Sequence, residues 1–312
     1  MNVLDLFCGA GGFAQGFKDA GFDVTGVDIS EYAGKTLELN RYGRFKKADL
    51  TEEIIKGEFD VVVGGPPCKP WSAVNTTKRG VAHQDFVLLS RFFEHIRVNK
   101  PKVFLLENVP LLAGEPSLKC HIARLENEEY SYSIMGKVIQ YSNYGAPTKR
   151  HRFILFGSKV GKAEKFFDDL HKFESKPKTV KWAIRGLREK QKNEVTDHVW
   201  PELTTIDKYI DKYKSHKFGW YILEWDKAAP SFGNIMKTYI LHPDAFNGGP
   251  KRVISVKEAS LIMGFDKDFH FPEGIGLGLR YQMVADSVSP MFSYVAANVI
   301  HNVIRGRDKH KS

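Results

Sequence analysis

The chain has few cysteines and no long apolar run, and both absences narrow its class. Its 312 residues include three cysteines, Cys8, Cys68 and Cys120, without the spacing of a disulfide framework or a zinc ribbon. The histidines are scattered without ligand spacing, so no metal site is expected. No apolar run approaches the roughly 20 residues of a membrane helix, and MNVLDLFCGA does not resemble a signal peptide. These absences predict a protein of the reducing cytoplasm with no membrane partner.

Acidic residues are outnumbered, and the excess positive charge is unevenly distributed. The formal net charge is +9 and the pI about 9.2, which favours an anionic partner. Residues 171–220 hold twelve Lys and Arg against seven Asp and Glu, so this segment alone carries a net +5. Such clustering is typical of a nucleic-acid footprint, although a solvated basic face has the same composition.

Up to about residue 160, short apolar runs alternate with amphipathic segments. The apolar runs are typical of buried strands in a parallel sheet, and they are 2–7, 23–29, 59–65, 102–109 and 152–158. Helical segments are expected at 12–20, 31–42, 84–97 and 118–128. This alternation predicts an α/β fold with a doubly wound, mostly parallel sheet that is covered on both faces.

The sequence changes character after residue 170. The next stretch is basic, rich in Trp and Tyr, and has no alternation of strand and helix, which predicts a second, smaller and irregular domain. Residues 255–265 are helical again, and 287–304 are expected to form a final helix that packs on the sheet. We therefore expect one domain over residues 1–178 and 276–312, with the irregular domain inserted at 179–275.

The first strand runs into a glycine-rich turn, DLFCGAGGFAQGF (5–17), at the start of a helix. The second strand ends at Asp28, which could accept hydrogen bonds from ribose hydroxyls, and the third ends at Asp49, which could meet an adenine edge. The pattern is not the GxGxxG of a dinucleotide site, so a nicotinamide oxidoreductase is disfavoured. It favours an adenosine cofactor without a pyrophosphate, such as S-adenosylmethionine, over a simple turn.

A second turn, GGPPCKPWS (64–72), follows the strand FDVVV. Pro66 and Pro67 stop the strand and restrict the turn, so Cys68 is presented stiffly at a strand end. A thiol suits chemistry at carbon 5 of cytosine, which becomes nucleophilic only after addition at carbon 6. Glu107 ends the next strand and could bond or protonate N3 of the ring. The alternatives are a small buried cysteine and a buried acid that caps a helix.

These motifs, together with those further along the chain, resemble the motifs of the DNA (cytosine-5)-methyltransferase family. They cover nearly the whole chain and occur in that family's usual order. DLFCGAGGF is similar to the cofactor loop, GVD and KADL to the cofactor-facing acids, GGPPCKPWS to the nucleophile loop, and ENV to the N3-binding acid. GAPTKRHRFILFG is similar to the stretch with two arginines, RVISVKEASLIMGF to the support of the recognition domain, and YQMVADSVSP to the final motif. Three residues depart from the pattern: Thr148 replaces the usual Gln, and Ala285-Asp286 replaces the usual Gly-Asn.

The resemblance implies a Rossmann-like, S-adenosylmethionine-dependent methyltransferase of the prokaryotic restriction-modification type. The catalytic residues that it implies are Cys68, Glu107, Arg150 and Arg152. The cofactor, S-adenosyl-L-methionine, would be bound by Phe7, Gly9, Ala10, Gly11, Gly12, Asp28, Ile29, Asp49, Leu50, Pro67, Ser287 and Val288. Double-stranded DNA would be contacted by Ser72, Arg79, Lys149, Lys181 and Arg185.

The expected reaction is methyl transfer to carbon 5 of a cytosine flipped out of a short, specific duplex site, through a covalent bond between Cys68 and carbon 6. The protein is expected to be a monomer in the prokaryotic cytoplasm, associated with the nucleoid, with any cognate restriction endonuclease acting separately. Two alternatives stay open, a tRNA cytosine-5 methyltransferase and a catalytically idle DNA-binding module of the same fold. The long basic region argues against the first, and the presence of both Cys68 and Glu107 argues against the second.

Overall fold

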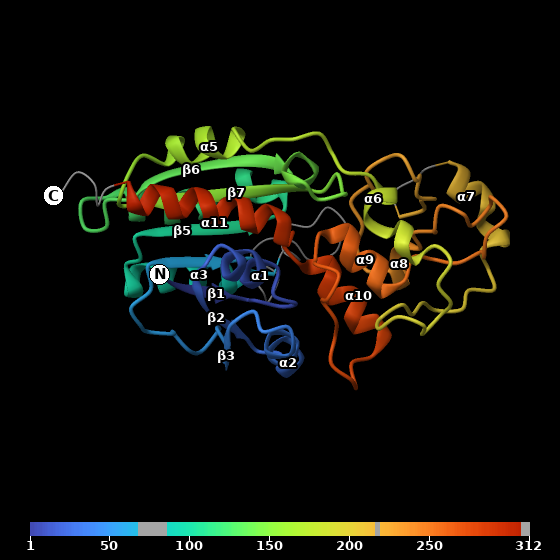
Figure 1. Cartoon of the computed structure of the whole chain (residues 1–312). Helices are drawn as coiled ribbons and strands as arrows, with labels where there is room; N and C mark the ends of the chain where they lie inside the picture. The colour runs from blue at the N-terminus through green and yellow to red at the C-terminus, as the bar shows by residue number, and fades with distance from the viewer. Residues whose placement is uncertain (68–85, 216–218, 307–312) are drawn as a thin grey trace.

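A seven-stranded sheet organises the computed structural model, which describes residues 1–67, 86–215 and 219–306 (Figure 1). The strand order is β3-β2-β1-β4-β5-β7-β6. The strands are β1 (Asn2–Leu6), β2 (Asp23–Asp28), β3 (Arg44–Lys47), β4 (Val61–Gly64), β5 (Val103–Asn108), β6 (Ser133–Gln140) and β7 (His151–Ser158). The chain turns to opposite sides of the sheet after β1 and after β4, so ligands are expected at the carboxyl ends of these two strands. The prediction of a doubly wound α/β fold is confirmed.

One predicted strand direction is wrong, because β7 runs antiparallel to both of its neighbours, β5 and β6. The chain between β6 and β7 contains only a 3-10 turn, η5 (Tyr141–Tyr144). A parallel connection needs a crossover of a dozen or more residues, usually with a helix, and this link is too short for one. The sequence prediction also missed β6. All of its residues except Ile139 are half-buried or exposed, so the strand is not a continuous apolar run.

Helices cover both faces of the sheet, and alternate strand residues supply the two cores. On one side, Val3 and Val61 join α1 (Gly12–Asp19), α5 (Ala163–His171) and α11 (Pro290–Arg305), with α1 and α5 packed against α11 (Figure 1). On the other side, Leu4 and Val62 join α3 (Val87–Asn99) and α4 (Pro116–Glu126). The turn η4 (Pro110–Gly114) precedes α4, and α2 (Glu31–Leu39) packs on β2 and β3. We call this part of the molecule the sheet lobe.

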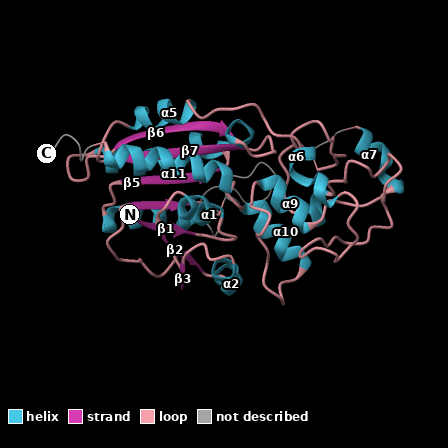
Figure 2. Ribbon diagram, viewed as in Figure 1, coloured by secondary structure: helices cyan, strands magenta, loops and turns pink. Residues whose placement is uncertain are grey.

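A second lobe, which we call the helical lobe, lies beside the sheet and consists mostly of loops and short helices (Figure 2). Its elements are α6 (Val180–Ile184), η6 (Arg185–Leu187), η7 (Asp207–Tyr209), α7 (Ile210–Lys214), α8 (Ile235–Thr238), α9 (Val256–Met263) and α10 (Leu277–Asp286). Three isolated bridges replace a regular sheet here: Thr148 with Ala229, Ile222 with Leu241, and Leu241 with Val253. The irregular character that the sequence predicts after residue 170 is therefore present.

The helical lobe is held by buried charges as well as by apolar packing. Arg252 and Glu258, 4% and 0% exposed, form a two-pronged ion pair with N···O distances of 2.7 and 2.8 Å. Ser255 caps α9, and the carboxylate of Glu258 accepts its backbone N–H at 2.7 Å.

None of the helices in the described ranges is long and apolar enough to cross a membrane.

Candidate active site

The turn between β1 and α1 is shaped to receive a ligand. Phe7, Gly9 and Gly11 have φ values of 61°, 53° and 85°, a left-handed backbone that bends the chain back at the start of α1. A Cβ placed on Gly12 would lie 2.1 Å from the carbonyl oxygen of Val288, so α1 approaches the chain before α11 too closely for any side chain. A Cβ on Gly9 would meet nothing nearer than 4.0 Å. The turn is therefore tight on the Gly12 side and open above Gly9.

Asp28 holds this turn in place. Its carboxylate accepts the backbone N–H of Gly9 at 3.0 Å with Oδ2 and that of Ser30 at 2.9 Å with Oδ1. Burial raises the pKa of Asp28, and these backbone hydrogen bonds oppose that rise. Each carboxylate oxygen can accept a second donor, so Asp28 remains able to bind hydroxyl groups. The neighbouring Ile29 is 60% exposed and offers an apolar surface beside the acid.

Asp49 and Leu50 lie next to Asp28 across the sheet edge. Strand β3 ends at Lys47, two residues earlier than expected, and the N–H of Ala48 donates to the carbonyl of Asp28 at 3.1 Å. The Oδ1 of Asp49 accepts the hydroxyl and the backbone N–H of Thr51, and these bonds lower its pKa. Leu50, the next residue, is buried. The two acids thus lie on neighbouring segments, but the prediction that Asp49 ends the third strand is wrong, because Asp49 follows β3 by two residues.

The carboxyl ends of β1 and β2, with the turn after β1, form one corner of the sheet. Asp5 belongs to this corner, and the sequence interpretation did not single it out. It lies in β1 at 1% exposure, and its Oδ2 has no partner among the described residues. Burial raises its pKa well above the usual range, and the charge of Asp28 adds to the effect. An acid inside an otherwise apolar strand was the available signal. The open space above Gly9, the free acceptor capacity of Asp28 and this unpaired oxygen all fit a ligand that carries hydroxyl and amino donors.

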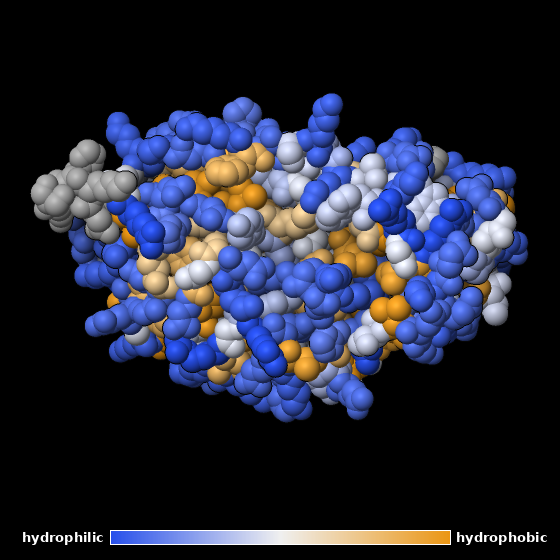
Figure 3. Space-filling view, viewed as in Figure 1, coloured by the Kyte–Doolittle hydropathy of each residue, from blue (hydrophilic) through white to orange (hydrophobic). Residues whose placement is uncertain are grey.

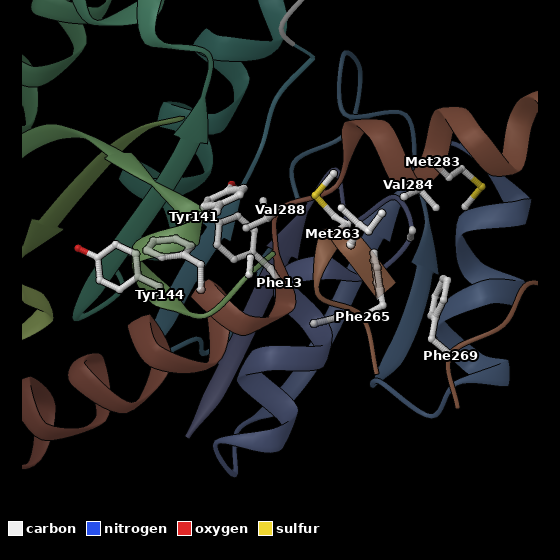
Figure 4. Packing of buried hydrophobic residues seen from close by; sticks show 14 of the residues in the cluster. Phe13, Tyr141, Tyr144, Met263, Phe265, Phe269, Met283, Val284 and Val288 are labelled. Carbon is white, nitrogen blue, oxygen red and sulfur yellow. The ribbon is translucent and has the colours of Figure 1, made fainter. Parts of the chain in front are cut away.

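The chain after α10 completes this corner. Val288, 6% exposed, lies in the same apolar cluster as Phe13 (Figure 4). The hydroxyl of Ser287 donates to the carbonyl of Met283 at 2.7 Å. Asp286, which replaces the usual Asn, accepts both of its bonds from Gln282, at 2.9 and 2.8 Å. The substituted position is therefore paired within α10.

The turn after β4 is fixed from the neighbouring strand. Asn108, at the end of β5, donates its amide to the carbonyl of Pro66 at 2.9 Å and is almost fully buried. A Cβ on Gly65 would lie 3.3 Å from Oε2 of Glu107, so the turn and this carboxyl group are immediate neighbours. Pro67 is the last described residue before a gap. Cys68, Ser72 and Arg79 lie outside the described residues.

Glu107 is buried and held by two donors on one oxygen. Its Oε1 accepts the hydroxyl of Tyr141 at 2.9 Å and the Nε of Arg152 at 2.8 Å. Glu107 is 6% exposed, and the side chain of Arg152 is 11% exposed. The structure therefore brings two predicted catalytic residues, Glu107 and Arg152, into contact beside the Pro66-Pro67 turn, together with Tyr141, which the sequence interpretation did not single out.

Arg150 takes a different position from Arg152. It lies one residue before β7, and its guanidinium donates to the carbonyls of Phe232 at 3.1 Å and Ala285 at 2.5 Å. The structure thus does not pair Arg150 with Glu107, and this arginine links the sheet lobe to the helical lobe. The adjacent Thr148, which replaces the usual Gln, is buried and donates to the carbonyl of Pro230 at 3.4 Å.

The two remaining cysteines differ in exposure. Cys8 is buried in the turn after β1, and burial raises the pKa of its thiol well above the usual range. A thiol that stays protonated is a poor nucleophile. Cys120 is exposed on α4. Neither cysteine lies with Glu107 and Arg152.

The predicted DNA-contacting residues within the described ranges lie at the surface. Lys149, Lys181 and Arg185 are all exposed. Beside them, Trp182 is 54% exposed, and the ammonium group of Lys178 lies 3.8 Å from its ring centroid. Hydrophilic side chains cover most of the helical lobe on the face shown in Figure 3. The surface around α6 thus combines positive charge with an aromatic ring, as nucleic-acid surfaces do.

The chain is similar in sequence to curated methyltransferases and similar in fold to solved ones. The chain is 28% identical to the type II methyltransferase M.FnuDI from Fusobacterium nucleatum, over 100% of this chain and 97% of that protein. It is also 28% identical to M.MthTI from Methanothermobacter thermautotrophicus, over 98% of each chain. Two solved structures share the fold at low identity. The Entamoeba histolytica methyltransferase EhMeth gives a TM-score of 0.72 at 18% identity, with 98% of each chain covered. The S. pombe Dnmt2 methyltransferase gives 0.68 at 16%, also with 98% covered.

Residues 1–302 match the family described as C-5 cytosine-specific DNA methylase, which is almost the whole chain. This match includes the turn after β1, the acids at the ends of the following strands, and the buried Glu107 beside the Pro66-Pro67 turn. The chain therefore belongs to the C-5 cytosine-specific DNA methylase family and is a DNA (cytosine-5) methyltransferase.

Proposed function

We propose that this enzyme methylates a cytosine that has left the DNA duplex, through a transient covalent bond between Cys68 and carbon 6. The observation that supports this most directly is the position of Glu107. Its Oε2 faces Gly65, three residues before Cys68, while its Oε1 is fixed by Tyr141 and Arg152. An acid so placed can hold N3 of a base whose carbon 6 lies near the thiol.

The proposed reaction is an addition to the cytosine ring followed by an elimination. The Cys68 thiolate gives an electron pair to carbon 6, ring electrons move to N3, and N3 takes a proton from Glu107. Carbon 5 has then become nucleophilic and takes the methyl group, and the sulfur of the methyl donor keeps the electrons of the bond that breaks. Loss of the carbon 5 proton to a water molecule restores the double bond, the Cys68 sulfur leaves with the electrons of the C–S bond, and N3 returns its proton to Glu107. Carbon 6 is shielded within the base stack, so the base must first swing out of the duplex.

S-adenosylmethionine supplies the methyl group when it is bound, and the corner around β1 and β2 fits it. We assign the ribose hydroxyls to Asp28, the adenine to Ile29, Asp49 and Leu50, and the methionine end to the turn from Phe7 to Gly12. Ser287 and Val288 close the corner from the side of α11. The free acceptor capacity of Asp28 and the unpaired oxygen of Asp5 support this assignment.

We further propose that residues 179–275 form the recognition domain, inserted into a catalytic domain of residues 1–178 and 276–312. Support comes from the exposed basic residues around α6 and from the contacts of Arg150 and Thr148, which join the two parts. The type II methyltransferases among the relatives suggest a restriction endonuclease that acts separately. Arg152 acts directly on the catalytic acid in this scheme, whereas Arg150 positions the recognition domain.

A duplex that contains 5-fluorocytosine tests the covalent step. Fluorine at carbon 5 cannot leave as a proton does, so the adduct formed after methyl transfer cannot break down. A denaturant-resistant protein–DNA band should form in the presence of S-adenosylmethionine. Cys68→Ser should abolish it, and Cys120→Ser, with its thiol exposed on α4, should retain it. Carbon 5 methylation at the wild-type rate by Cys68→Ser would overturn the mechanism.

Bisulfite sequencing of DNA from cells that express the protein tests the substrate and the site together. A single short sequence with protected cytosines is expected. A parallel filter assay with labelled S-adenosylmethionine compares duplex DNA with tRNA. Methyl transfer to tRNA alone would mean that the substrate is tRNA and not DNA. Transfer to neither would favour a catalytically idle DNA-binding module.

A further inference from the structure

The cluster around Glu107 takes one residue from β5, one from β7 and one from the turn that directly follows β6. In the β5–β7 pair, Glu107 lies opposite Ile154, so Arg152, two residues from Ile154, projects from the same face. In the β6–β7 pair, Ile139 lies opposite Arg152, and Tyr141 follows Ile139 by two residues. The backbone N–H of Tyr141 donates to the carbonyl of Arg150 at 2.9 Å, which continues the ladder past the end of β6. The register therefore aligns Glu107, Arg152 and Tyr141 on one face of the sheet.

Tyr141 is fixed in position and remains a hydrogen-bond donor. It is fully buried, and its ring stacks on Phe292 of α11 with centroids 5.4 Å apart and an interplanar angle of 24°. Burial raises the pKa of Tyr141 well above its usual range, and the charge of Glu107 raises it further. The phenol therefore stays protonated at neutral pH. Its hydroxyl donates to Oε1 of Glu107 at 2.9 Å.

The two donors leave the oxygens of Glu107 unequal. Both Tyr141 and Arg152 bind Oε1, whereas Oε2 is turned toward Gly65 at the start of the nucleophile turn. An oxygen that already accepts two donors is a poor place for a proton, so the proton of the neutral acid belongs on Oε2. That oxygen faces the side from which the base would approach.

We infer that Tyr141 is a positioning residue, which together with Arg152 orients Glu107 so that Oε2 is the oxygen that exchanges a proton with N3 of the target cytosine. This inference rests on the proposed role of Glu107 as the N3-binding acid. Without the phenol hydroxyl, the carboxyl group keeps one donor and can rotate about its terminal bond. The proton is then presented to N3 in only part of the molecules, which slows the chemical step and leaves the binding of DNA and cofactor unchanged.

Tyr141→Phe tests the inference, because it removes one oxygen and keeps the ring that stacks on Phe292. We expect kcat to fall roughly tenfold, the size of effect expected for loss of one hydrogen bond, with KM for DNA and for S-adenosylmethionine within about twofold of wild type. The matched control is Tyr144→Phe in the same 3-10 turn. Tyr144 also contacts Phe292, but its hydroxyl donates to Glu174 at 3.1 Å, so kcat should not change.

A second measurement separates this inference from the proposed function. Glu107→Gln should lower kcat by about a hundredfold or more, and adding Tyr141→Phe to it should cause little further loss, because the two side chains act through one contact. If Glu107→Gln keeps wild-type activity, the proposed function fails. If Glu107→Gln is inactive but Tyr141→Phe retains wild-type kcat, or if the effects of the two changes multiply in full, only the role of Tyr141 fails. Equal losses in Tyr141→Phe and Tyr144→Phe would also overturn it, as a general effect of the turn.

Discussion

The two lobes of this methyltransferase are stabilised in different ways. The sheet lobe buries alternate apolar residues of regular strands under helices, and its buried ion pair, Glu107 with Arg152, lies at the candidate active site. The helical lobe has short helices and isolated bridges, and it places Arg252, Glu258 and His242 in its interior. Apolar packing tolerates many sequences of suitable volume, whereas a buried ion pair requires both partners in one geometry. The helical lobe should therefore respond more sharply to single substitutions.

The largest effect is expected from Glu258→Ala. This change leaves the guanidinium of Arg252, 4% exposed, without its carboxylate, and it also removes the acceptor for the N–H of Ser255. Breaking a buried ion pair on one side costs about 3–5 kcal/mol. Urea unfolding followed by circular dichroism should show this loss in the free energy of unfolding.

Glu224→Ala is the matched control, because the pair of Glu224 with Lys227 is more than half exposed on both sides. Its cost should stay below about 1 kcal/mol. Replacing Arg252 and Glu258 together by Met and Leu should recover part of the loss, since no unpaired charge is then buried. If Glu258→Ala cost no more than Glu224→Ala, the contrast between the lobes would be wrong.

The sequence predicts most of the sheet lobe because its signals are local. Buried strands such as β4 and β5 are continuous apolar runs, and the acids and the Pro66-Pro67 turn stand at their carboxyl ends. Strand β6 was missed because its burial is mixed, and β7 was given the wrong direction because the run RFILFGS does not indicate how its strand pairs. Direction depends on the length of the link from β6, which becomes informative only once β6 is known.

Site residues could be predicted where they stand at the end of a strand. Contacts that depend on how two strands pair could not be predicted. Glu107 and Asp28 follow from strand ends alone. The contact of Tyr141 with Glu107 spans three strands and depends on the pairing of β6 with β7. Arg150 and Arg152 were both expected to be catalytic residues, but Arg150 precedes the strand, and its guanidinium donates to Phe232 and Ala285. The spacing of residues along the sequence does not predict the direction in which such a side chain points.

A smaller effect, confined to the sheet lobe, is expected from Asp28→Ala. The carboxylate is the proposed acceptor for the ribose hydroxyls, and a hydrogen bond to a charged group contributes about 1.5–3 kcal/mol. Calorimetry with S-adenosylhomocysteine should show a dissociation constant raised at least tenfold. Binding of DNA should be unchanged.

Asp23→Ala provides the comparison on the same strand, since Asp23 lies exposed at the start of β2 and pairs with Arg44 at 2.9 Å. Its cofactor affinity should match that of wild type. Asp28→Asn keeps one acceptor oxygen and should lose less affinity than Asp28→Ala. Unchanged affinity in Asp28→Ala would mean that the ribose is held elsewhere.

The smallest effect is expected from removing one surface charge, and it tests whether the helical lobe is where DNA binds. Lys181 lies exposed on α6, and its ammonium group is 3.8 Å from the exposed carboxylate of Asp226, a long pair that a phosphate can replace. Lys181→Ala should weaken DNA binding a few-fold at physiological salt and lower the slope of log K against log salt concentration by roughly one. Lys165→Ala removes the same charge from α5 of the sheet lobe, where Lys165 pairs with Asp169 at 2.7 Å. Titrating a fluorescent duplex at four salt concentrations compares the two. Equal slopes for both variants would mean that net charge, rather than the surface of the helical lobe, attracts the DNA.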